Sequence, residues 1–181
     1  MKFINILTTF LPWIAFSVLS AFYPPYAVPA GIIFSLFSYP KLLKGFILDW
    51  ASLLFFIVVF VDYQIFKNFW LVQHMSTLVT LFFVSVAAFS LLFRQPFTIQ
   101  YAKLEVKKKF WKSPQFIRAN QLMTGGFGII FLFMALANLY RTYYDSSLNQ
   151  WVVWGIGIAA QVLFIERFPK WYRKKYLRSK K

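Results

Sequence analysis

The chain has 181 residues, of which 60% are hydrophobic, 23% are aromatic and only 14% are charged, and its formal net charge is +15. A soluble domain of this size carries about a quarter charged residues and has too high a surface-to-volume ratio to bury so many large apolar side chains. We therefore expect a membrane protein, and the apolar content argues against a nucleic-acid-binding protein despite the positive charge. The absence of cysteine excludes disulfides, a thiol nucleophile and cysteine-based metal centres.

Two apolar segments precede residue 45, and their number of membrane crossings stays open. Phe3 to Tyr23 is long enough to cross a bilayer, although it contains Pro12. Ala27 to Tyr39 is short and bracketed by prolines, which tend to end helices. It crosses only if the residues from Lys41 to Lys44 complete it, and a re-entrant or tilted segment is the alternative.

Four further segments are long and apolar enough to span a bilayer. The fold class we predict is therefore all-α, a polytopic membrane bundle of six transmembrane helices, or five with an irregular N-terminal piece. We expect residues 1–181 to form a single integral membrane domain. The four segments are Gly45 to Val61, Phe69 to Phe93, Leu122 to Tyr140 and Leu148 to Ile165.

Positive charge is concentrated in residues 94–118, between the second and third of these segments, and in the tail, residues 167–181. At helical spacing, Phe97, Tyr101, Leu104 and Trp111 share one stripe, which predicts an amphipathic helix from Phe97 to Trp111 at the membrane surface. An ordinary positive loop and a stop-transfer anchor are the plain alternatives. The residues predicted to contact anionic lipid or partner proteins are Arg94, Phe97, Tyr101, Lys103, Leu104, Lys107, Lys108, Lys109, Trp111, Lys112, Trp171, Arg173, Lys174 and Lys175.

The distribution of Lys and Arg also predicts orientation, because basic residues are enriched in short cytoplasmic loops. With six spans, every Lys and Arg except Lys67 and Arg141 lies on one side. With five spans, only Lys2 changes side. The basic segment and the C-terminus are predicted to be cytoplasmic in both arrangements.

Few polar residues lie within the apolar segments, and each is a candidate for function because its burial in lipid is costly. We expect Asp49 to pair with Lys41 or Lys44. Asp62 and His74 lie near the outer ends of successive spans and form the only plausible acid–base pair, although simple hydrogen bonding at the interface is the alternative. The full set is Asp49, Asp62, His74, Asn120, Asn138 and Gln161.

Two groups of small residues are expected to serve close helix packing. Gly125, Gly126 and Gly128 stand at the start of one span, and Gly155, Gly157 and Ala159 lie in the last. The GGFG stretch lacks the Lys and Ser/Thr of a phosphate-binding loop. No metal-ligand cluster and no Ser–His–Asp set can be assembled, so we expect neither an enzyme nor a cofactor or metal site.

Several short stretches resemble the intracellular septation protein A family of small bacterial inner-membrane proteins. They are FLPW near the N-terminus, RQPF at residues 94–97, Trp111, Asn120, FLFMALANLY at residues 131–140, Tyr143 with Tyr144, and NQWVVWGIGIAAQVLF at residues 149–164. The chain departs from that family in its long basic stretch, its GGFG and its longer tail. The resemblance implies a multi-pass protein of the bacterial inner membrane that supports envelope maintenance and septation through contacts with other envelope proteins.

We therefore predict a non-enzymatic membrane protein whose partners are anionic lipids, other envelope or division membrane proteins and a second copy of itself, with no nucleic acid. A small transporter or channel using Asp49, Asn120 and Gln161 is the alternative. A lipid-modifying enzyme using Asp62 and His74 is a third, weaker hypothesis.

Overall fold

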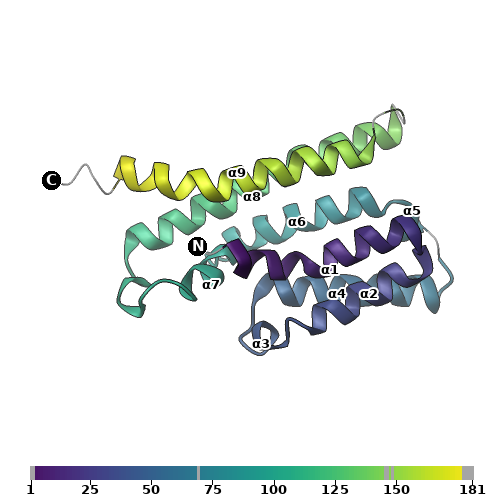
Figure 1. Ribbon diagram of the computed structural model, residues 1–181, viewed down its shortest axis with the longest axis horizontal. Coiled ribbons are helices and arrows are strands. Elements are labelled where there is room, and N and C mark those ends of the chain that lie inside the picture. The colour runs from purple at the N-terminus through teal and green to yellow at the C-terminus, as the bar shows by residue number, and fades with distance from the viewer. Residues whose placement is uncertain (1–2, 69, 145–146, 148, 177–181) are drawn as a thin grey trace. The chain divides into compact units, whose positions relative to one another are not determined.

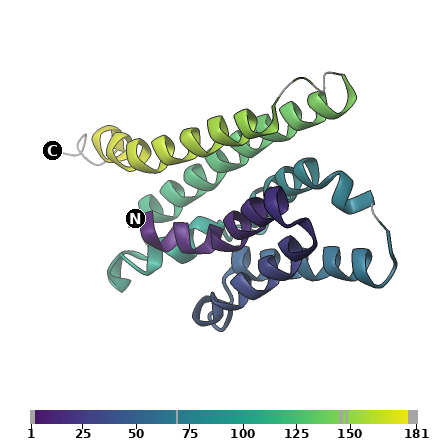
Figure 2. The same cartoon turned by 45° about the vertical axis from the view of Figure 1, so that its right-hand side comes forward.

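The computed structural model describes residues 3–68, 70–144, 147 and 149–176, and over these ranges it consists of helices and their connections without strands (Figures 1 and 2). The all-α class predicted from the sequence is confirmed. The chain packs as two compact units, Lys2–Met75 and Ser76–Lys181, here called the N-terminal and C-terminal units.

The N-terminal unit begins with a helical hairpin in which Tyr23 alone separates the first two helices. The second helix has only 13 residues, a length of about 20 Å, whereas a bilayer's hydrocarbon core is about 30 Å thick. Helix α2 alone is therefore too short to cross the hydrocarbon core. The helices of this unit are α1 (Phe3–Phe22), α2 (Pro24–Leu36), α3 (Tyr39–Leu42), α4 (Ile47–Gln64) and α5 (Trp70–Gln73).

An aromatic cluster around Phe56 forms the core of the N-terminal unit. The Phe56 side chain is fully buried, and its ring centroid lies 4.6 Å from that of Trp13 and 5.6 Å from that of Phe16. Trp13 Nε1 donates a hydrogen bond of 3.0 Å to Ser52 Oγ, which joins α1 to α4. On α2, a Cβ at Gly31 would lie 2.5 Å from the Phe56 ring. Only glycine permits this approach of α2 to α4.

The C-terminal unit continues from α6 (Met75–Leu92) through α7 (Phe97–Lys103) and a short 3₁₀ turn (Lys108–Phe110) to two long helices, α8 (Pro114–Tyr143) and α9 (Gln150–Tyr176). Helix α6 packs antiparallel to α8. The rings of Phe83 and Phe131 stack with centroids 4.6 Å apart, and Asn138 near the end of α8 donates to the Ser76 carbonyl at the start of α6.

Helices α8 and α9 lie side by side and antiparallel (Figures 1 and 2). A Cβ on Gly126 would collide with the ring of Phe164, and one on Gly157 would collide with Met134. The packing role predicted for these two glycines is confirmed. Gly155, in contrast, faces open space, so its spacing with Ala159 does not serve the α8–α9 contact.

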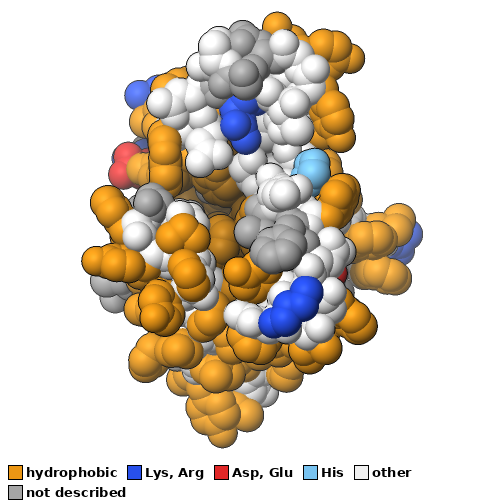
Figure 3. Space-filling view, turned by 90° about the vertical axis from the view of Figure 1, so that its right-hand side faces the viewer, with side chains coloured by type: hydrophobic (Ala, Val, Ile, Leu, Met, Phe, Trp, Pro, Cys, Tyr) orange, Lys and Arg blue, Asp and Glu red, His pale blue; other side chains and the backbone are white. Residues whose placement is uncertain are grey.

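Four helices are long and apolar enough to cross a bilayer, namely α4, α6, α8 and α9. They correspond to the four segments predicted from the sequence. Their outward faces carry many exposed aliphatic and aromatic side chains, and Figure 3 shows hydrophobic side chains over much of the flanks in that view. Lipid would solvate these faces, as expected of a membrane protein.

One predicted boundary is wrong. The segment expected to run unbroken from Phe69 to Phe93 divides at His74, where α5 ends and a turn precedes α6. Phe69 lies outside the described residues.

Replacing Gly31 with Ala should lower the free energy of unfolding by about 1–3 kcal/mol, because the new methyl overpacks a Phe56 ring that Trp13 and Phe16 hold in place. Thermal or denaturant unfolding in detergent would measure the change. The matched control is Gly155→Ala, which has open space around it and should be neutral or stabilising by up to about 1 kcal/mol. Equal effects of the two substitutions would contradict the packing described for α2 and α4.

Candidate functional site

The basic segment begins at the turn that ends α6. Arg94 adopts a left-handed conformation with φ 56°, its N–H donates to the Leu91 carbonyl, and the N–H of Gln95 donates to the Ser90 carbonyl. Glycine is usual at this position of a helix-ending turn, and Gly45 occupies it in the equivalent turn after α3. An arginine here costs roughly 1 kcal/mol of backbone strain. In return it places a cation beside the negative end of α6.

Helix α7 then docks onto α8. Thr98 Oγ1 donates to the Asn120 carbonyl at 3.0 Å and lies 2.8 Å from Thr124 Oγ1. Phe97 packs near Phe127, with ring centroids 6.0 Å apart, and Tyr101 is 1% exposed. Phe97 and Tyr101 were predicted to contact lipid or partners. That prediction is wrong, because both rings are buried and stabilise the fold.

The single amphipathic helix predicted from Phe97 to Trp111 does not form. Helix α7 ends at Lys103, and the chain turns before the 3₁₀ segment. A continuous helix would stack Lys103 over Lys107 and Lys108 over Lys112, and like charges at this spacing are destabilising. Trp111 closes the turn instead, as its Nε1 donates to the Val106 carbonyl at 2.8 Å. Lys103 Nζ lies 5.4 Å from the centroid of the Trp111 ring.

The resulting loop presents cations and apolar side chains together. Leu104 and Phe110 are 45% and 48% exposed, and Lys109 Nζ lies 5.0 Å from the Phe110 ring centroid. The exposed lysines Lys107, Lys108, Lys109 and Lys112 surround them. Ser113 then caps α8 by accepting a hydrogen bond from the Phe116 N–H. Most of the predicted contact residues therefore lie on one exposed surface.

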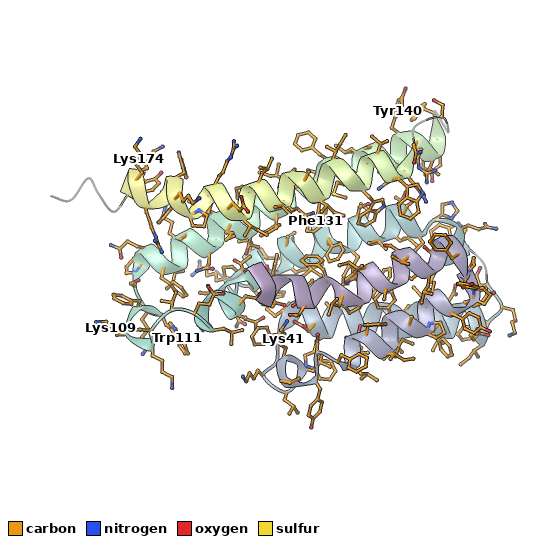
Figure 4. The ribbon with its side chains drawn as sticks, in the orientation of Figure 1. Lys41, Lys109, Trp111, Phe131, Tyr140 and Lys174 are labelled. Carbon is orange, nitrogen blue, oxygen red and sulfur yellow. The ribbon has the colours of Figure 1, made fainter. Side chains whose placement is uncertain are left out.

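The end of α9 lies beside the beginning of α8. Tyr172 is 5% exposed, and its hydroxyl donates to the Gln115 carbonyl at 3.3 Å. The loop residues Lys109 and Trp111 and the α9 residue Lys174 lie at the same end of the C-terminal unit (Figure 4). Arg173, Lys174 and Lys175 are exposed, and Trp171 is 48% exposed. Tail residues 177–181 lie outside the described residues.

We call this surface the basic end. It comprises Arg94, Lys103, Leu104, Lys107, Lys108, Lys109, Phe110, Trp111, Lys112, Arg118, Trp171, Arg173, Lys174 and Lys175. Arg118, Tyr172 and Tyr176 were not among the residues predicted to contact lipid or partners. Tyr172 and Tyr176 of α9 contact Gln115 and Arg118 of α8 because α9 folds back along α8, which no local pattern reveals.

Asp49 is held at the start of α4 rather than deep within a span. It lies in the first turn of that helix and is 3% exposed. Lys41 donates to Thr8 Oγ1 at 2.7 Å and to Thr9 Oγ1 at 2.8 Å. Burial lowers the pKa of Lys41, and the negative charge of Asp49 partly offsets that effect. Asp49 and Lys41 therefore interact electrostatically, as predicted for one of the two lysines. The other, Lys44, is exposed.

Asp62 and His74 each have other partners, so the predicted acid–base pair is not formed. Asn68 Nδ2 donates to Asp62 Oδ1 at 3.1 Å. His74 Nδ1 is 2.9 Å from the Trp70 carbonyl, and the two rings stack with centroids 4.6 Å apart. A carbonyl only accepts hydrogen bonds, so Nδ1 carries the proton. These separate contacts stabilise local turns, and they give no support to a lipid-modifying enzyme.

The three amides of the C-terminal unit that were candidates for function contact other parts of this unit. Asn138 is fully buried and joins α8 to α6, while Gln161 Nε2 is 3.9 Å from Met134 Sδ on α8. Asn120 Nδ2 donates within its own helix, to the Phe116 carbonyl. Asn120 and Gln161 were named for a transport path. Asn120 lies near the start of α8, whereas Gln161 lies on α9 and contacts Met134, several turns further along α8. The two amides do not converge, so this unit gives that hypothesis no support.

Among the described residues, no group of three or more His, Cys, Asp or Glu side chains could hold a metal ion. Comparison with protein-family models, with curated proteins and with solved structures finds no match to this chain. Function is therefore inferred from the chain's own residues.

Replacing Lys41 with Met should destabilise the protein, because Asp49 then keeps a buried charge without the lysine that offsets it. Asp49→Asn should also destabilise, whereas the double variant should recover part of the loss. A double-mutant cycle on unfolding in detergent should give a coupling energy of about 1–3 kcal/mol. Additive effects would show that the two side chains do not interact.

Proposed function

We propose that this chain is a non-enzymatic integral membrane protein whose basic end binds anionic lipid head groups at one face of the bilayer. The observation that carries the proposal is the gathering of exposed Lys, Arg and aromatic side chains at one end of the C-terminal unit. Each cation near an anionic surface contributes about 1 kcal/mol of attraction. Exposed rings such as Trp171 favour the same interfacial depth.

Helix length supports this placement. Helix α8 has 30 residues and α9 has 27, which gives lengths of about 45 and 40 Å, against roughly 30 Å of hydrocarbon. The helix length beyond the hydrocarbon thickness lies in the polar first turns of α8 and in the basic last turns of α9. Both helices therefore extend their charged ends to the depth of the lipid phosphates.

The positive-inside rule places the basic end on the cytoplasmic side. The resemblance to the septation protein A family extends the proposal to a bacterial inner membrane, with a role in envelope maintenance and septation. The outward face of α9, which includes the exposed residues Val152, Gly155, Ile156 and Ala159, is the surface we propose for lateral contact with other division proteins or with a second copy.

Replacing Lys108 and Lys109 with Gln should weaken binding of a fluorescent phosphatidylglycerol probe to the purified protein by at least about tenfold, because two exposed cations are lost. The matched control Lys108→Arg with Lys109→Arg keeps the charge and should bind as tightly as the native protein. High salt should reduce the difference by screening. No preference of the native protein for phosphatidylglycerol over phosphatidylcholine would contradict the proposal.

Arg94 allows charge and backbone strain to be separated. Arg94→Gly and Arg94→Ala remove the same charge, but glycine adopts the φ of 56° without strain. We expect both variants to bind the anionic probe more weakly, and the Gly variant to be more stable than the Ala variant by about 1 kcal/mol. Unchanged lipid binding in both variants would show that Arg94 is not a lipid contact.

A further inference from the structure

Two cations from different helices converge on one ring at the basic end. The Arg118 guanidinium, from α8, lies 5.9 Å from the centroid of the Tyr176 ring, and Lys175 Nζ, from α9, lies 5.5 Å from the same centroid. Lys175 also lies 5.1 Å from the centroid of the Trp171 ring. The hydrogen bond from Tyr172 to Gln115 fixes the two helix ends that carry these side chains.

This arrangement holds two like charges close together. Both lie within 6 Å of one ring centroid, so the two charged groups are at most about 11 Å apart. Like charges at such distances, near the screening length of about 8 Å at physiological salt, repel each other. The structure gives neither cation an ion pair with a described carboxylate. Both side chains are exposed. An anion that reaches them from solvent or from the membrane surface would relieve the repulsion.

We propose that Arg118 and Lys175, positioned by Tyr176, form a binding site for a phosphate oxyanion. The planar guanidinium can donate two parallel hydrogen bonds to phosphate oxygens, and the ammonium adds a compact charge from the other helix. The inference rests on the proposed function, because lipid phosphates reach the site only if this end lies at the membrane surface. A head-group phosphate and free inorganic phosphate share the same chemistry.

The test compares two double variants of the full chain in nanodiscs. Arg118→Gln with Lys175→Gln removes the convergent pair. Lys112→Gln with Lys174→Gln removes one exposed charge from the loop before α8 and one from α9. Neither Lys112 nor Lys174 has a cation–ring contact among the described residues. We expect the first double variant to lose at least about tenfold more affinity for a fluorescent phosphatidylglycerol probe than the second. Each single variant, Arg118→Gln or Lys175→Gln, should lose nearly as much as the pair.

Titration with inorganic phosphate distinguishes the sources. Loss of phosphate binding by Arg118→Gln with Lys175→Gln, without loss of lipid binding, would support the site with soluble phosphate as its ligand. Equal losses of lipid affinity in the two double variants, with no effect on phosphate, would overturn the site while leaving the proposed function intact. If neither double variant loses lipid affinity, the phosphate site and the proposed function are both contradicted.

The role of Tyr176 is tested separately. Tyr176→Phe keeps the ring that both cations contact and should bind the probe as the native chain does, whereas Tyr176→Ala should lose affinity as the double variant does. Unfolding curves for both variants check that the fold is retained. Equal affinity of Tyr176→Ala and the native chain would show that the ring does not position the cations.

Discussion

The antiparallel packing of α8 against α9 is the constraint on which the rest of the proposed site depends. Gly126 and Gly157 let the ring of Phe164 and the side chain of Met134 fill the helix interface, and Tyr172 fixes the far end of α9 to the first turn of α8. Two basic stretches about fifty residues apart in sequence thereby form one surface. Without this contact, the loop and the tail would be separate positive segments with no shared geometry.

The cost of that surface is electrostatic. Exposed lysines and arginines repel one another, and Arg94 adds backbone strain at a turn where glycine is usual. Cation–ring contacts to Trp111, Trp171 and Tyr176 offset part of the repulsion. Under the proposed function, anionic lipid at the membrane surface offsets the remainder. In the N-terminal unit, by contrast, the positive charge of Lys41 interacts with the negative charge of Asp49.

Much of the fold follows from the sequence because long apolar segments bounded by charge specify membrane helices strongly. The four helices long and apolar enough to cross a bilayer are of this kind. The packing role of Gly126 and Gly157 was predicted from their small size. The amphipathic helix predicted from Phe97 to Trp111 was wrong, because the spacing of apolar residues does not include the repulsion between lysines one turn apart. It also does not include the docking of α7 onto α8 through Thr98. The similar positions of Asp62 and His74 near the ends of successive spans suggested a pair. Asp62 instead contacts Asn68, and His74 contacts Trp70, both of which are nearer in sequence. Arg118 and Tyr176 meet only through tertiary packing.

The absence of cysteine makes single-cysteine labelling the most direct test of the central claim, that the loop and the tail lie at the same membrane face. Lys109→Cys, Lys174→Cys and Thr142→Cys each place a thiol at an exposed position of the C-terminal unit. An impermeant maleimide should label the first two only in inverted vesicles and the third only in intact cells. Labelling of Lys109→Cys and Lys174→Cys from opposite sides would contradict the account.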